Sequence, residues 1–270
     1  MSLILCRHEP VRQPLYIDAL GICLYSSQEL CYVIVNHPFL VMDDFFRAPV
    51  VEFIRRDLDL PYLAARVEKA VGEGSSDDAL IFVLQECGYY TQEEISAFAQ
   101  KLTALRKLPL ARYLKEKADY YFQNGHYGTA ISLYERALAM PKEALPGDWF
   151  TGTVWNNLAA AYTNMFYFEK AMQAYERACD KTGDENVLKR MYFLKKLQPG
   201  LVMRERYRAA VTKENQERWD REYRQAFTDV LESDEIEKID DMFEAAEPKK
   251  RIEQAAEQVA CWKKEYRKMV

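Results

Sequence analysis

Apolar positions in the first part of the chain recur at helical spacing, between residues that start and stop helices. Residues 26–29 and 91–94 both have the capping-box order that opens a helix. The stretch 15–25 differs, because it is apolar and rich in tyrosine, and it favours a short strand or hairpin. Residues 1–108 are therefore predicted to form a small, chiefly helical domain, and no motif in them indicates a role.

Two segments near the middle of the chain repeat one arrangement of small and aromatic residues. The segment 130–137 reads AISLYERA, and the segment 171–178 reads AMQAYERA. Each is preceded by an alanine with a tyrosine three residues later. This pattern resembles the tetratricopeptide repeat, a helix-turn-helix unit of about 34 residues.

The resemblance places one repeat at about 111–144, a second at about 152–185 and a degenerate third at 186–198. It implies a stack of antiparallel helix pairs, in which alanines let the helices approach closely and tyrosines fill the gaps. The first copy departs from the pattern at Lys117, where an apolar residue is usual. The framework positions are Ala118, Tyr121, Ala130, Tyr134, Ala137, Trp155, Leu158, Ala159, Tyr162, Ala171, Tyr175 and Ala178.

Two repeats alone bury their apolar faces only against each other, so the flanking segments are expected to cap the stack. Ten glycines and ten prolines in 270 residues indicate short loops and abundant regular structure. The predicted fold class is all-α: a helical domain at 1–108, the repeat stack at 109–200, and charged helices at 201–270 that extend or form a hairpin.

The resemblance also implies where a partner would bind. In this family the first helix of each repeat lines a concave face, which holds a peptide or a helix of another protein. Asparagine side chains there can both donate to and accept from a peptide backbone. The corresponding positions are Arg112, Lys115, Asp119, Phe122, Thr153, Asn156, Asn157, Ala160 and Asn164.

A narrower form of this site, a clamp for the carboxylate of an acidic tail, is less well matched. Lys115 and Asn157 fall at clamp positions. Asp119 stands where an asparagine is usual and would repel a carboxylate, and Lys189 and Arg190 are out of register with the clamp.

The last part of the chain offers a different kind of surface. Tyr207, Trp219, Tyr223 and Phe227 follow one another at multiples of four residues, which predicts the apolar stripe of a single long helix. An exposed row of Trp219, Tyr223 and Phe227 would form a homodimer, or would be covered by a final helix over 252–266 that folds back on it. The sequence leaves both alternatives open.

Charge is unevenly distributed along an acidic chain. The net charge of −5 argues against a generic binder of nucleic acid or of anionic membranes. Residues 189–208 nevertheless hold seven bases and one acid, and residues 229–247 hold nine acids and one base. The basic segment could therefore bind nucleic acid or another anion in a regulatory role, or could be an ordinary solvated helix face.

Catalytic and metal-binding signals are missing from the sequence. The three histidines, His8, His37 and His126, are isolated, and no glycine-rich phosphate loop, nucleophile elbow or metal-ligand spacing occurs. We therefore expect no enzyme activity, cofactor or metal. No long apolar run predicts a membrane span, the first residues lack the features of a signal peptide, and six scattered cysteines suit a reducing cytoplasm. The sequence thus predicts a cytoplasmic adaptor or scaffold that binds another protein.

Overall fold

The computed structural model describes residues 11–244 and 248–270, so that Cys6, His8 and Glu247 lie outside the described residues. The described chain is all-α apart from one two-stranded hairpin, which confirms the predicted fold class. It divides into two compact units, Met1–Pro109 and Leu110–Val270. The charged segment after residue 200 belongs to the same unit as the helices before it.

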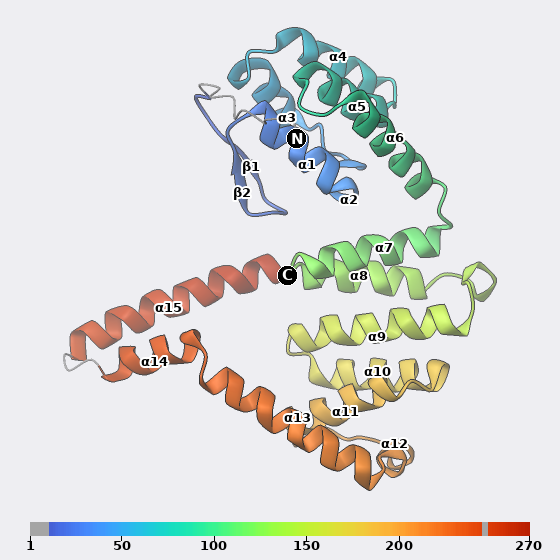
Figure 1. Ribbon diagram of the computed structural model, residues 1–270, viewed down its shortest axis with the longest axis vertical. Helices are drawn as coiled ribbons and strands as arrows, with labels where there is room; N and C mark the ends of the chain where they lie inside the picture. The colour runs from blue at the N-terminus through green and yellow to red at the C-terminus, as the bar shows by residue number, and fades with distance from the viewer. Residues whose placement is uncertain (1–10, 245–247) are drawn as a thin grey trace. The chain divides into compact units, whose positions relative to one another are not determined.

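The first unit contains the hairpin and six short or medium α-helices (Figure 1). The hairpin pairs β1, Leu15–Ile17, with β2, Ile22–Leu24, in antiparallel register. A π-helical turn, Phe53–Asp57, continues the third helix. The helices are α1, Ser27–Asn36; α2, Pro38–Val41; α3, Ala48–Glu52; α4, Pro61–Gly72; α5, Ser76–Cys87; and α6, Gln92–Arg106.

Both predicted helix starts in this unit are confirmed. The Ser26 hydroxyl accepts a hydrogen bond from the Glu29 amide at 3.2 Å. At α6 the cap is reciprocal: the Glu94 amide donates to the Thr91 hydroxyl at 3.3 Å, and the Thr91 amide donates to the Glu94 carboxylate at 2.8 Å. Such caps satisfy amide groups that the first turn of a helix leaves without a partner.

The second unit begins with five helices in which each packs against the next (Figure 1). Two helix pairs come first, and a single helix follows them. After these, the chain forms four more helices before its last described residue. The elements are α7, Leu110–Gln123; α8, Tyr127–Leu138; α9, Asp148–Asn164; α10, Phe168–Thr182; α11, Glu185–Leu197; α12, Glu205–Ala210; α13, Lys213–Leu231; α14, Asp234–Glu244; and α15, Pro248–Met269.

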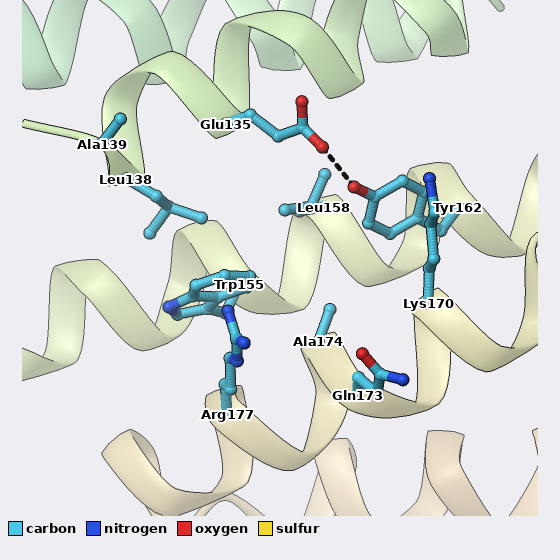
Figure 2. Close-up of a pocket in the computed structure, with 10 residues that line it drawn as sticks. All are labelled: Glu135, Leu138, Ala139, Trp155, Leu158, Tyr162, Lys170, Gln173, Ala174 and Arg177. Atoms are coloured by element: carbon cyan, nitrogen blue, oxygen red, sulfur yellow. Dashed lines mark hydrogen bonds between the residues drawn. The ribbon is translucent and has the colours of Figure 1, made fainter.

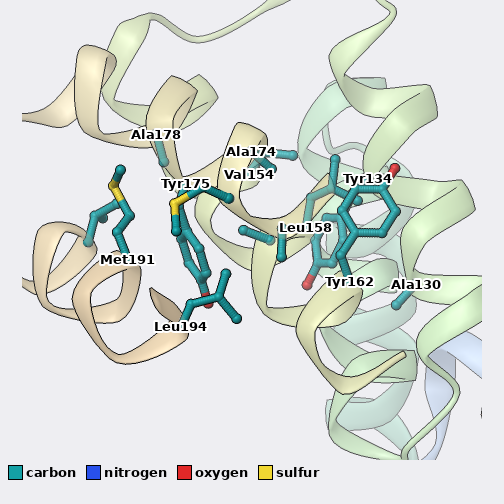
Figure 3. Packing of buried hydrophobic residues seen from close by; sticks show 14 of the residues in the cluster. Ala130, Tyr134, Val154, Leu158, Tyr162, Ala174, Tyr175, Ala178, Met191 and Leu194 are labelled. Atoms are coloured by element: carbon teal, nitrogen blue, oxygen red, sulfur yellow. The ribbon is translucent and has the colours of Figure 1, made fainter. Parts of the chain in front are cut away.

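One hydrophobic cluster runs through the stacked helices, part of which Figure 3 shows. The cluster also includes Trp219 of α13. Its alanines, such as Ala130 and Ala178, are fully buried and allow close helix contacts. Tyr134, with 1% of its surface exposed, fills the space between neighbouring helices. Gly152 serves close approach in the same way, because a Cβ there would collide with Lys181 and Thr182 of α10.

The prediction of one long helix through residues 207–227 is wrong. Val211 has an extended conformation between α12 and α13, and the Thr212 hydroxyl caps α13 by accepting from the Asn215 amide at 3.2 Å. A threonine at the cap position gives the helix a new start, which interrupts the apolar stripe. Trp219 then turns into the repeat stack and is fully buried, with its ring 5.6 Å from that of Tyr192.

The last helix also differs from the expectation that it folds back on this stripe. The main contacts of α15 are with α14 and, at its C-terminal end, with α8. The His126 ring, in the turn before α8, lies 2.9 Å from the Lys268 carbonyl oxygen through Nδ1. Because a carbonyl only accepts hydrogen bonds, Nδ1 must carry the proton here.

Candidate functional site

A row of polar side chains crosses the first helices of the stack, with Asp119 at its centre. The Asp119 Oδ1 atom accepts from the Asn157 amide at 3.0 Å and from the Tyr134 hydroxyl at 2.5 Å. The Oδ2 atom forms an ion pair with Lys115 at 2.6 Å. The aspartate that stands in place of the usual asparagine is thus held by groups from three helices, α7, α8 and α9.

The row continues to the next helix of the stack. Asn156 donates to the Oδ1 atom of Asn157 at 3.1 Å, and Arg190 of α11 donates to the Oδ1 atom of Asn156. Arg190, which the sequence placed out of register with the clamp, thus joins this face through Asn156. Lys189, one residue earlier, pairs instead with Glu222 of α13. We call Lys115, Asp119, Asn156, Asn157 and Arg190 the polar row.

Contact with Asp119 contributes to the pKa shifts of two side chains, Lys115 of the polar row and the neighbouring Tyr134. Burial acts to lower the pKa of Lys115, but its hydrogen bond to Asp119 and the nearby acidic charges prevail, so that the net shift raises it. Burial, followed by the hydrogen bond to Asp119, raises the pKa of Tyr134. Lys115 is therefore a cation and Tyr134 a neutral donor throughout the physiological range.

The other predicted binding positions have varied surroundings. Arg112 is exposed, and Ala160 is half-buried. The Phe122 ring packs in edge-to-face contact on Tyr127, with centroids 5.3 Å apart. Thr153 and Asn164 donate to backbone carbonyls of their own helix at 2.9 Å. These last two side chains therefore make local bonds, unlike Asn156 and Asn157.

The framework positions lie where the chain packs most tightly. Tyr121 and Trp155 are half-buried, and the other ten are buried. Their burial places them in the shared cluster of the stack rather than on its surface. The buried ten are Ala118, Ala130, Tyr134, Ala137, Leu158, Ala159, Tyr162, Ala171, Tyr175 and Ala178.

A cavity of about 540 Å³ opens between α8, α9 and α10 (Figure 2). Its floor includes Trp155 and Leu158, and its wall on α10 carries Lys170 and Arg177. No sequence motif indicates this cavity, although the spacing of Lys170 and Arg177 places both on one face of a helix.

The basic segment 189–208 is largely neutralised within the chain. Five of its seven cations form ion pairs, and Arg190 and Lys195 bond to oxygen atoms of neutral groups. None of the five partners lies in the acidic run 229–247. The five pairs are Lys189–Glu222, Lys196–Asp220, Arg204–Glu176, Arg206–Asp180 and Arg208–Glu205.

The predicted self-association row is divided between the interior and the surface. Trp219 is buried, and Tyr223 is half-buried with its ring 6.0 Å from that of Phe193. Phe227 is 57% exposed. The row therefore begins as an internal contact between α11 and α13, and only its end faces solvent.

Within 11–244 and 248–270, no three or more histidine, cysteine or acidic side chains are grouped so that they could hold a metal ion. Among the described helices, none combines the length and the apolar character that crossing a bilayer requires.

Comparison with known proteins places a family on the centre of the stack. The family model described as tetratricopeptide repeat matches residues 152–180, which span most of α9 and α10. No curated protein matches the chain, and no solved structure does. The matched segment is the second of the two copies found in the sequence, and its two helices form the expected antiparallel pair.

Proposed function

We propose that this chain, which carries tetratricopeptide-type helical repeats, is a non-catalytic adaptor that binds an extended segment of a partner protein on the face formed by α7, α9 and α11. The observation that carries the proposal is the polar row, which joins one helix of each successive pair. Tetratricopeptide repeats in general mediate contacts between proteins, and the finer assignment rests on the side chains of this face.

The polar row suits a peptide backbone because its side chains are already held in place. Arg190 uses one donor for Asn156 and has further guanidinium donors on an exposed side chain. Lys115 is already paired with Asp119 at 2.6 Å and with Glu116 at 3.5 Å, so Arg190 supplies most of the remaining donors. These donors favour the carbonyl oxygens of an extended backbone. Side chains that are ordered before binding lose less entropy when the partner arrives.

We place this function in the cytoplasm. The six cysteines are scattered along the sequence without a Cys-x-x-Cys pair, which is typical of chains in a reducing compartment. The proposed role needs only surface complementarity, and we assign no reacting group to any side chain.

The test is affinity capture from native lysate followed by binding of the purified partner. The bait variant carries Ala160→Arg and Asn164→Arg, which add bulk beside the polar row without removing any member of it. The matched control carries Ser132→Arg and Glu169→Arg, at exposed positions on α8 and α10. Circular dichroism verifies that both variants remain helical.

We expect one partner to be captured by the wild type and by the control, with purified affinity at least about tenfold weaker for the blocked variant, which is about 1.4 kcal/mol. Equal capture by all three baits would contradict the proposed site. If nucleic acid rather than a protein were captured, and if its binding weakened steeply with added salt, the basic segment 189–208 would be favoured as the binding site instead.

A further inference from the structure

The cavity between α8, α9 and α10 lies on side chains that the polar row does not use. Its floor is apolar and includes Leu158, Ala174 and the half-buried ring of Trp155 (Figure 2). At about 540 Å³ it falls within the size range of ligand-binding clefts. The cavity therefore has room for at least one apolar or aromatic side chain.

Two cations border this floor, and aromatic rings hold both of them. The Arg177 guanidinium lies 4.4 Å from the centroid of the Trp155 ring, and the Lys170 ammonium lies 5.6 Å from that of Tyr162. Within the described part of the chain, no carboxylate is at ion-pair distance from either cation. Both are exposed, so they are available to negative charges from outside.

The two cations are placed apart along one helix. Lys170 and Arg177 are seven residues apart on α10, which is about 10 Å along the helix axis. In this arrangement the two charged groups lie over different rings, those of Trp155 and Tyr162, so each can pair with its own carboxylate. A chain with carboxylates on either side of an apolar residue matches this spacing.

The opposite wall favours a peptide over a nucleic acid. Glu135 of α8 faces the cavity and accepts a hydrogen bond from the Tyr162 hydroxyl (Figure 2). Burial and this hydrogen bond raise the pKa of Tyr162, so the hydroxyl remains a donor and holds the carboxylate in place. This carboxylate can accept from a peptide N–H group, whereas a phosphodiester group has no donor to offer it.

From this combination we propose a second binding site: the cavity between α8, α9 and α10 takes an acidic peptide segment of a partner protein. An apolar or aromatic side chain of that segment occupies the floor over Leu158. Carboxylates on either side pair with Lys170 and Arg177. The site shares no residue with the polar row, so a partner could bind one of them or both.

The probe is a fluorescein-labelled pentapeptide, Asp-Glu-Phe-Glu-Asp, blocked at both ends and titrated with the full chain. Two comparison peptides replace the phenylalanine with serine or the four acids with lysine. Nuclear magnetic resonance of the labelled chain locates the bound peptide through shifts at Trp155, Lys170 and Arg177.

The main variant is Lys170→Glu with Arg177→Glu. Its matched control, Arg136→Glu with Lys142→Glu, makes the same change in charge at exposed positions that do not line the cavity. A third variant, Ala139→Trp, fills the cavity from α8 and leaves its charges in place. Thermal unfolding and helicity are measured for all of them.

We expect the phenylalanine peptide to bind the wild type and the charge control equally, and to bind both cavity variants at least tenfold more weakly. No shift at the cavity with millimolar peptide would overturn the proposal. Equal binding of the serine peptide, or displacement by a single-stranded oligonucleotide, would also overturn it, since either indicates charge attraction without the apolar site. The variants of the polar row are not involved, so this result is independent of the proposed adaptor site.

Discussion

Asn157 donates a hydrogen bond to the Oδ1 atom of Asp119 over 3.0 Å, and this bond joins α9 to α7. The same oxygen accepts from Tyr134 of α8, while Oδ2 pairs with Lys115 of α7. One carboxylate thus links three helices: Oδ1 accepts two hydrogen bonds, and Oδ2 forms the ion pair. The contributions of the hydrogen bonds and of the ion pair to stability can therefore be measured separately.

Asp119→Ala should lower the free energy of unfolding by about 1–3 kcal/mol, because Tyr134, Asn157 and Lys115 all lose a partner. Asp119→Asn should cost less, within about 1 kcal/mol, since its amide oxygen can still accept both bonds and only the partly exposed ion pair is lost. Chemical denaturation of the two variants measures both values. Equal losses would show that the ion pair, rather than the shared oxygen, holds the row together.

Trp219→Ala should lower the free energy of unfolding by about 3–5 kcal/mol, because it leaves a large cavity between α11 and α13. Trp219→Phe should cost clearly less, since the buried Nε1 atom of Trp219 makes no hydrogen bond that would be lost. Phe227→Ala, at a 57% exposed position, is the matched control and should change stability by less than about 1 kcal/mol.

Equilibrium denaturation measures these differences, and light scattering follows the oligomeric state. If Trp219→Ala dissociated a dimer without affecting the stability of the monomer, Trp219 would be part of a subunit interface rather than of the core.

Much of the fold could be predicted because its signals are local. The capping residues at 26–29 and 91–94 act within one turn, and the alternation of alanine and tyrosine in 130–137 and 171–178 is fixed by helix contacts within a pair. The break at Val211 is also encoded locally, by a threonine at the cap position. This break was not predicted, because the apolar residues between 207 and 227 keep their four-residue spacing on both sides of it.

The polar row could be predicted only in part. The positions of Lys115, Asp119 and Asn157 followed from the repeat pattern, but their mutual hydrogen bonds depend on side-chain rotamers. Arg190 was placed out of register with the clamp, and its bond to Asn156 was not expected, because residues 185–197 lack the alanine pattern that sets the register of the two copies. The cavity beside Lys170 depends on the approach of three helices, which no single segment encodes.

The stability that the contact between α13 and α11 contributes should depend on pH. Hydrogen bonds from Tyr192 and Lys196 lower the pKa of Asp220 below its ordinary value of 3.8. A carboxyl group whose pKa is lowered in the folded state stabilises that state above the unfolded pKa, and this contribution is lost as the pH falls through the folded pKa. Asp220→Asn should therefore lower the melting temperature at pH 7, and the difference from wild type should shrink below about pH 4.

Melting temperatures of both proteins between pH 7 and pH 2.5 measure this dependence. Asp229→Asn, whose partner Gln225 is uncharged and lies on its own helix, is the control. A difference that stayed constant with pH would mean that Asp220 contributes through shape alone.

The contact between α15 and α8 depends on the absence of a side chain at Gly128. A Cβ atom there would collide with the backbone carbonyl of Val270, and backbone cannot move aside as a flexible side chain can. Gly128→Ala should therefore release the last turn of α15, although alanine favours the helix in which it stands by about 1 kcal/mol. Hydrogen exchange should accelerate at the end of α15 and stay unchanged in α9. Gly72→Ala, whose Cβ meets nothing within 4 Å, should affect neither, and unchanged protection of α15 in Gly128→Ala would show that this helix is not held by α8 in solution.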